Sequence, residues 1–225
     1  MKPLVFNLLI CLSLALCPLL SHAQGSLRLQ IGPTFATGDF GDDNILADND
    51  AGGAGIGLGV GIQYLHPLSV EGLSLFGSLN INHFELKNDV KDDLESRAIN
   101  NADVTIGRYF SIPLAAGLSY QFEIEGNVAL FTHFGLALNF LKLTSIIYET
   151  NTVETSFNYD VSSTVGAKIG VGIFLNESLF VELNYYGLGE HDLDGEIENT
   201  GQQDSRFDGD QKVGYFTLGL GFPID

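Results

Sequence analysis

Four titratable residues stand inside segments that are otherwise almost free of charge: Arg28, His133, Lys168 and Glu182. A histidine with a carboxylate is a common pair for general acid and base chemistry. His133 follows Thr132, but the sequence places no matching serine and carboxylate beside it, so a hydrolase triad is not predicted. We predict no catalytic residue. We expect the four side chains to form a polar network that fills an interior.

Two other patterns resemble ligand sites without meeting their requirements. The glycines from Gly53 to Gly61 do not stand at a strand-to-helix turn, where a phosphate-binding loop would lie. The acidic stretches 48–52 and 208–212 lack the spacing of a calcium-binding loop. The sequence therefore predicts no cofactor and no metal ligand.

The elements that must position these residues are strands of an unusual kind. From Gly52 to Tyr64 one face is apolar, whereas the other carries glycine at nearly every position. A soluble strand normally turns polar side chains to water on its second face. A strand with apolar and small faces instead fits a membrane barrel, with lipid outside and a filled interior.

Similar alternation recurs in eight segments, each long enough to cross a bilayer as a tilted strand. Phe76 and Phe84 are expected to point inward, where they fill space left open by neighbouring glycines. The expected strands are Ser26–Thr37, Gly52–Leu65, Leu73–Leu86, Val104–Phe122, Asn127–Leu141, Val161–Phe174, Leu179–Leu188 and Val213–Ile224.

The lengths of the connections alternate as well. Three are short, and the remaining four, 38–51, 87–103, 142–160 and 189–212, are long. Outer-membrane barrels have short periplasmic turns and longer extracellular loops. The predicted fold is therefore all-β: an eight-stranded antiparallel up-and-down transmembrane β-barrel with four long extracellular loops. Both termini are expected in the periplasm, and the cell outer membrane is the expected location.

The first residues predict the route to that membrane. Met1–Ala23 has Lys2, an apolar run and the small-residue ending Ser-His-Ala, which is typical of a cleaved signal peptide. An uncleaved anchor is the alternative, but the run is short for a membrane-spanning helix. Both cysteines lie in this segment. The expected organisation is a signal peptide over 1–23 and one barrel domain over 24–225.

The formal net charge is −18, and most of the carboxylates lie in the four long connections. Such charge argues against a nucleic-acid partner. Its plainest interpretation is solvation, while divalent-cation bridging to anionic lipopolysaccharide stays open. The expected partners are outer-membrane lipid and lipopolysaccharide, together with an extracellular surface partner of the loops.

Aromatic residues gather near the expected strand ends, as in the interfacial girdles of membrane barrels. We expect nine of them at the membrane interfaces: Phe35, Tyr64, Phe110, Tyr120, Phe122, Phe140, Tyr185, Phe216 and Phe222.

The signal peptide, the eight alternating strands and the segment Tyr-Phe-Ser-Ile-Pro-Leu at 109–114 resemble the outer-membrane β-barrel domain family, most nearly its porin-like proteins of Bacteroidota. The resemblance implies insertion by the barrel assembly machinery. That machinery reads a last-strand pattern, which Thr217, Gly219, Phe222 and Ile224 match loosely. The chain departs from the pattern by ending in Asp225 rather than in an aromatic residue.

The sequence favours a nonenzymatic outer-membrane protein that is structural or binds a surface partner through its acidic loops. Three alternatives remain at this point: a narrow porin-like channel for small solutes, a lipid-modifying outer-membrane enzyme, and a soluble lipocalin-like binder with its apolar faces turned inward. The last is disfavoured because the opposite strand faces carry too few charged residues to meet water.

Overall fold

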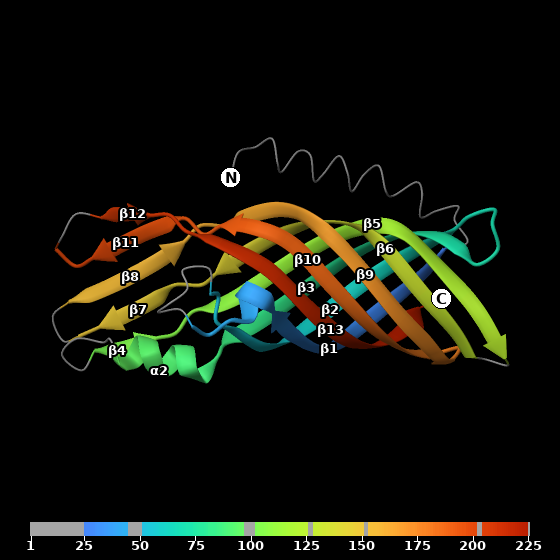
Figure 1. The fold of residues 1–225 in the computed structure, drawn as a ribbon, viewed down its shortest axis with the longest axis horizontal. Coiled ribbons are helices and arrows are strands. Elements are labelled where there is room, and N and C mark those ends of the chain that lie inside the picture. The colour runs from blue at the N-terminus through green and yellow to red at the C-terminus, as the bar shows by residue number, and fades with distance from the viewer. Residues whose placement is uncertain are drawn as a thin grey trace.

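The computed structural model describes residues 25–44, 51–96, 102–125, 128–150, 153–201 and 204–224. Its main body is a closed antiparallel barrel in which the strand order is β1-β13-β10-β9-β6-β5-β3-β2 (Figure 1). The barrel closes where the first and last strands pair, from Leu27 opposite Ile224 to Thr37 opposite Gly214. The eight strands are β1 (Ser26–Thr37), β2 (Ala54–Pro67), β3 (Leu73–Leu86), β5 (Arg108–Glu125), β6 (Val128–Leu143), β9 (Ser162–Asn176), β10 (Leu179–Asp192) and β13 (Asp210–Ile224).

The apolar strand faces form the outer wall of the barrel. Ile56 is 68% exposed, Leu136 66% and Val165 64%. Polar and glycine positions of the same strands face the interior, where Gln63 and Asn80 are buried. The predicted direction of the alternation is thus confirmed. The lipocalin-like alternative is wrong for this chain, because its apolar faces do not line a cavity.

The predicted strand boundaries hold best at the start of the barrel. β1 and β3 coincide with their predicted ranges. Each of the other barrel strands extends two to four residues beyond one predicted end, and β2, β5, β6 and β9 begin one to four residues later than predicted. The predicted segment Val104–Phe122 is divided between two elements, since β4 (Asp103–Thr105) belongs to a different sheet from β5. Phe76 and Phe84 are buried inside the barrel, as predicted.

A second sheet continues from one end of the barrel (Figure 1). Its order is β12-β11-β8-β7-β4. Besides β4 it contains β7 (Ile146–Glu149), β8 (Glu154–Tyr159), β11 (Gly195–Asn199) and β12 (Ser205–Phe207). β7, β8, β11 and β12 lie in connections that were expected to be loops, and the structure shows that these connections contain paired strands. The strands have three to six residues, which is too short for their alternation to stand out among many acidic residues.

The two ends of the barrel therefore differ. At the turn end, short connections join β2 to β3 and β9 to β10, and the barrel strands begin at Ser26 and finish at Ile224. At the sheet end, the chain forms the second sheet, a 3-10 turn (Gly38–Gly41) and the helix α2 (Asn88–Ser96). Gly53 has a φ of 64°, which permits the chain to enter β2 directly beneath Val90 of α2.

Candidate functional site

The lumen at the turn end is filled by one arginine among three aromatic rings. Arg28 is 5% exposed. Its guanidinium carbon lies 4.7 Å from the ring centres of Phe131 and Phe174 and 5.7 Å from that of Phe180. Its Nη2 donates a hydrogen bond of 3.3 Å to Gln121 Oε1. The delocalised guanidinium suits such stacking, so Arg28 contributes packing as well as charge.

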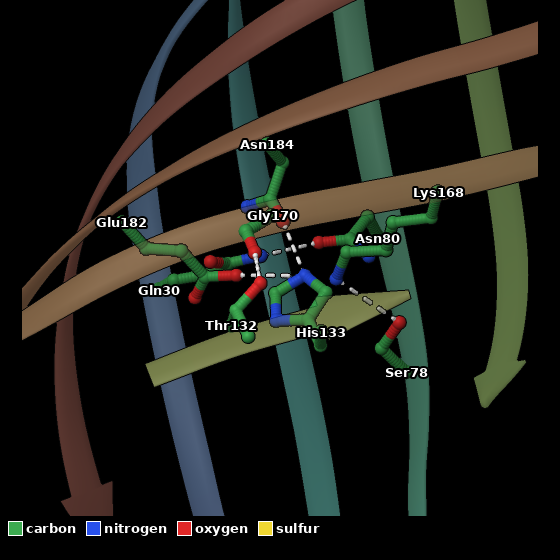
Figure 2. Close-up of polar contacts among 9 residues, drawn as sticks. All are labelled: Gln30, Ser78, Asn80, Thr132, His133, Lys168, Gly170, Glu182 and Asn184. Carbon is green, nitrogen blue, oxygen red and sulfur yellow. Dashed lines mark hydrogen bonds and ion pairs between the residues drawn. The ribbon is translucent and has the colours of Figure 1, made fainter. Parts of the chain in front are cut away.

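The middle of the lumen holds a second group around His133 (Figure 2). Its Nε2 lies 2.7 Å from Asn184 Oδ1 and 3.2 Å from Glu182 Oε1. Both neighbours are acceptor oxygens, so Nε2 carries the proton and donates it. All three side chains are almost fully buried. β6 and β10, which both pair with β9, therefore contact one another over Gly170 of β9 through this group.

Lys168 points from β9 toward β3 in the same layer (Figure 2). Its ammonium donates to Ser78 Oγ at 3.4 Å and lies 5.5 Å from the ring centres of Phe76 and Tyr186. The side chain is fully buried. The buried Glu182 carboxylate attracts this ammonium electrostatically. The structure thus brings three of the four sequence-predicted interior residues, His133, Lys168 and Glu182, into one layer and places Arg28 in the layer beside it.

A hydrogen-bonded chain occupies the lumen at the sheet end. Asn82 Nδ2 donates to the Tyr215 hydroxyl at 2.9 Å, and that hydroxyl lies 3.1 Å from Ser111 Oγ. Ser111 Oγ donates to Asn139 Oδ1 at 2.8 Å. Asn139 Nδ2 lies 3.0 Å from His191 Nε2. Since the amide nitrogen is the donor, that ring nitrogen is the acceptor.

The interior glycines make room for these large side chains. A Cβ atom at Gly170 would lie 2.3 Å from His133 Nε2, and one at Gly172 would lie 2.2 Å from Phe131 Cζ. Real Cβ contacts are never so short. The glycine-rich inner faces therefore belong to a densely filled lumen and not to an open one.

A small void lies in the middle of the lumen. A space of about 10 Å³ lies among Gln30, Asn80, Asn82 and Thr217. This is about the volume that one water molecule needs. Gln30 Oε1, Asn80 Nδ2 and Thr217 Oγ1 are buried without a protein hydrogen-bond partner. The void therefore suits a single bound water and does not admit a solute.

The predicted interface aromatics lie on the outer wall in two groups. Toward the sheet end, Tyr185 packs against Phe216 with ring centres 4.9 Å apart, and Phe216 is directly opposite Phe35. Toward the turn end, Tyr120 and Phe122 are 4.4 Å apart. The strand positions of Phe110 and Phe140 place them with the first group, and those of Tyr64 and Phe222 place them with the second.

The four residues of the predicted assembly pattern lie on β13. Thr217 is buried on the lumen side, where Gly219 lies beside the side chain of Gln30. Phe222 and Ile224 are exposed on the outer wall. This arrangement gives a polar inner face and an apolar outer face to the last strand. Recognition of these residues by an assembly machinery stays a prediction.

The second sheet has two different faces. On one face, Phe207 contacts Tyr159 and Phe157, with ring centres 5.1 and 6.3 Å apart. Burial raises the pKa of Tyr159 to about 12, so its hydroxyl is protonated at neutral pH. On the other face, Arg206 forms exposed ion pairs with Asp160 at 3.1 Å and Glu196 at 3.3 Å.

The lumen also contains polar residues that sequence reasoning did not single out, chiefly Asn82, Asn184, His191 and Tyr215. All four are buried and hydrogen-bonded. The sequence could have indicated them, because a polar or hydroxyl-bearing residue stood at an inward-facing position of a strand whose outward positions are apolar. Asparagine and tyrosine carry no charge that distinguishes them from other inward residues, and His191 lies beyond Leu188, where the predicted strand ends.

Across the described ranges, no helix combines the length and apolar character needed to cross a membrane. Within the same ranges, no three His, Cys, Asp or Glu side chains are grouped closely enough to hold a metal ion.

The comparison with known families decides which barrel this is. The model of the outer membrane protein beta-barrel domain matches residues 9–221. The chain belongs to this family. Membership in the outer membrane protein beta-barrel domain family supports an outer-membrane location. No curated protein matches the sequence.

A solved outer-membrane barrel shows the same fold as this family member. A major outer membrane protein from Thermus thermophilus is 13% identical, with 89% of this chain and 99% of that chain covered at a TM-score of 0.51. Two further solved structures are similar at lower scores. OprG from Pseudomonas aeruginosa is 12% identical, covering 90% and 97% at a TM-score of 0.48. Ail, the attachment invasion locus protein of Yersinia pestis, is 13% identical, covering 90% and 99% at a TM-score of 0.45.

Proposed function

We propose that this outer-membrane barrel is a nonenzymatic anchor that presents its second sheet and acidic connections to a partner outside the cell. The observation that carries the proposal is the combination of a filled lumen with a sheet extending from one barrel end. The filled interior supports anchorage, and the sheet supplies a surface beyond the apolar wall.

The proposal includes an orientation. Short turns at one end and long structured connections at the other match outer-membrane barrels, whose long connections are extracellular. The sheet end then faces outward, and both ends of the barrel sequence face the periplasm. The outer wall contacts lipid and lipopolysaccharide, and insertion uses the barrel assembly machinery.

The charge of the sheet suggests the chemistry of the partner. Glu149, Glu154, Glu196 and Glu198 lie on β7, β8 and β11, and Arg206 pairs with Glu196. A surface with this excess of carboxylates attracts positively charged groups and repels anions, most strongly at low ionic strength. The partner we propose is therefore a basic region of a protein on a surface outside the cell.

Two alternative functions, a solute channel and a lipid-modifying enzyme, have less support. A channel requires a continuous wet path, but aromatic rings and hydrogen-bonded side chains occupy the lumen at the turn end, the middle and the sheet end. A lipid-modifying enzyme requires a nucleophile and a base at the outer rim. His133 lies deep in the lumen, where its Nε2 contacts an amide oxygen and a carboxylate.

The test uses the full chain in lipid nanodiscs and a surface coated with poly-lysine as a basic probe. In the sheet variant, Glu149, Glu154, Glu196 and Glu198 are replaced by glutamine. In the control variant, Glu71, Glu123 and Glu177 at the turn end are replaced in the same way. We expect the sheet variant to bind at least tenfold more weakly at low salt and the control to bind like the wild type.

Equal loss in the two variants would show that net charge alone drives binding, and it would contradict the role of the sheet. Discrete current steps from the wild-type protein in planar bilayers would contradict the closed anchor and favour the channel.

A further inference from the structure

A hollow of about 470 Å³ lies on the outer wall at the sheet end, where β1, β2 and β3 approach α2. Its apolar side includes Phe35 and Ile56, which are directly opposite one another and are 38% and 68% exposed. Gly55, next to Ile56, has no side chain to fill the space. Because Phe35 and Ile56 belong to the apolar outer wall of a membrane barrel, this side of the hollow contacts acyl chains.

Two lysines line the same hollow. The Cγ atom of Lys87 lies 3.5 Å from where a Cβ of Gly55 would be, so the Lys87 side chain crosses the outer face of β2. Its Nζ pairs with Asp43 at 3.3 Å. Lys91 of α2 pairs with Glu85 at 3.2 Å. The hollow therefore has one apolar side and one cationic side.

A third cation stands on the neighbouring strand. Arg108 is exposed and precedes the buried Tyr109, so its side chain lies on the outer face of β5. It is directly opposite Glu85, which is also exposed between two buried residues. Glu85 thus stands between Lys91 and Arg108. Among the described residues, Arg108 forms no ion pair.

We call Lys87, Lys91 and Arg108 the basic rim cluster. Its three cations face two carboxylates, those of Asp43 and Glu85. Within the described ranges, the four carboxylates of α2 form no ion pair with the cluster. The cluster therefore keeps a positive excess in a chain whose formal net charge is −18.

The two rims of the barrel differ in charge. Lys142 and Lys212 also occupy outward positions at the sheet end. At the turn end, the described part of the outer surface has no lysine or arginine, and the exposed residues there include Glu71, Glu123 and Glu177. Basic side chains near a membrane surface attract anionic lipid, and carboxylates repel it. An anionic headgroup is therefore favoured at the sheet-end rim alone.

The chemistry of the cluster suits a phosphate. A guanidinium offers paired N–H donors that match phosphate oxygens, while an ammonium acts as a point charge. Ion pairs between exposed side chains, such as Lys87 with Asp43, contribute little, so the lysines can turn to a phosphate without a large loss. A neutral headgroup would gain nothing from the cations, and a free anion would gain nothing from the apolar side.

We propose that this hollow binds a lipid with an anionic phosphate headgroup, whose phosphate contacts Lys87, Lys91 and Arg108 and whose acyl chain lies on Phe35 and Ile56. The inference rests on the proposed contact between the outer wall and lipid, and it specifies the headgroup of one lipid at that wall. It does not depend on a partner of the second sheet.

The test measures which lipid stands next to the hollow. The chain contains no tryptophan, so Phe35→Trp introduces a single tryptophan reporter at the apolar side. Phe122→Trp, at a position 50% exposed on the outer wall at the turn end, is the reference reporter. Each full-length variant is inserted into phosphatidylcholine vesicles, and its tryptophan fluorescence is titrated with phosphatidic acid or phosphatidylcholine whose acyl chains carry bromine, which quenches on contact.

The measured quantity is the preference for phosphatidic acid over phosphatidylcholine at each reporter. We expect this preference to be at least about fivefold larger at position 35 than at position 122, and to decrease as salt is added. A fivefold ratio converts to about 1 kcal/mol, the attraction of one basic side chain near anionic lipid.

Two pairs of substitutions separate the cluster from net charge. In the Phe35→Trp protein, Lys87→Gln with Arg108→Gln should lower the preference to that of the reference reporter. Lys212→Gln with Arg206→Gln removes the same charge from another part of the rim, where Lys212 pairs with Asp39 at 3.5 Å, and from the second sheet. This control pair should leave the preference at position 35 largely unchanged.

Any of four results would overturn the proposal: the same preference at both reporters, an unchanged preference in the folded cluster variant, an equal loss in the control pair, or loss of the preference when excess inorganic phosphate is added at constant ionic strength. The last result would mean that the cations take the free anion.

Folding of each variant is checked by heat-modifiable gel migration. Should Phe35→Trp not fold, Ile56→Trp on the opposite strand is the reporter. Quenching by brominated phosphatidylcholine shows separately whether the outer wall contacts lipid at all, so a failure of the proposed lipid contact is distinguished from a failure of the headgroup preference.

Discussion

The Nε2 atom of His133 lies 3.2 Å from Oε1 of Glu182 in the middle of the lumen. Both side chains are completely buried. The carboxylate also attracts the Lys168 ammonium, so one negative charge serves two neighbours. Buried charges are stable only when they are paired and hydrogen-bonded. Glu182 supplies the negative charge that attracts both Lys168 and Arg28, and neither of its oxygens has a hydrogen-bond partner among the described residues.

Replacing Glu182 by alanine should lower the free energy of unfolding by about 3 kcal/mol, because Lys168 is then left buried without a countercharge. The measurement is urea unfolding in lipid vesicles, followed by gel migration. Combining Glu182→Leu with Lys168→Met removes both charges and should recover more than half of the loss. A double variant that is less stable than Glu182→Ala would show that the pair is not coupled in this way.

Interior glycines should resist even one added methyl group. A Cβ at Gly221 would lie 2.0 Å from Phe180 Cζ, whereas nothing lies within 4 Å of one at Gly77. We expect Gly221→Ala to destabilise the barrel by roughly 1 to 3 kcal/mol through overpacking. Gly77→Ala, in the same barrel, should be neutral or slightly stabilising. Similar stability in both variants would indicate that the lumen is loosely packed.

The lumen should not conduct ions. Arg28 fills the turn end against Phe131 and Phe174, and further layers close the middle and the sheet end. The wild-type protein and Arg28→Ala should both give no discrete current steps in planar bilayers. Openings in Arg28→Ala alone would mean that the arginine is the sole barrier and that the other two layers are permeable.

The outer wall should tolerate no charge near its middle. Leu136 is 66% exposed on the apolar wall, and an arginine near the bilayer midplane costs about 2 to 4 kcal/mol. Leu136→Arg should therefore lower the yield of folded barrel in vesicles, measured by gel migration. Val153→Arg is the control, since Val153 is exposed in the connection between β7 and β8. Equal yields would argue that Leu136 does not contact lipid.

Much of the barrel could be predicted because each strand face has a single environment. The run from Ile56 to Ile62 repeats every two residues, which is the period of a strand, and its apolar members lie outside. Ala54, just before a shift of register, is buried instead. β7 and β12 gave no such signal. With only three or four residues, these strands are defined by the partners with which they pair.

Part of the interior network could be predicted from the alternation of inward and outward positions along each strand. Parity placed Arg28, His133, Lys168 and Glu182 on inward positions, and the structure buries all four. Parity does not define distance across the lumen. The contact between His133 and Asn184 depends on the barrel's closure and strand tilt, which no single strand encodes.

The sequence by itself determined the fold class, the direction in which the apolar faces turn and the segregation of acidic residues, since these follow from the local period of each strand. Tertiary structure alone decided the second sheet and the layers that close the lumen. Each of these joins residues far apart in the chain, so its geometry exists only once the barrel has closed and fixed the register of every strand.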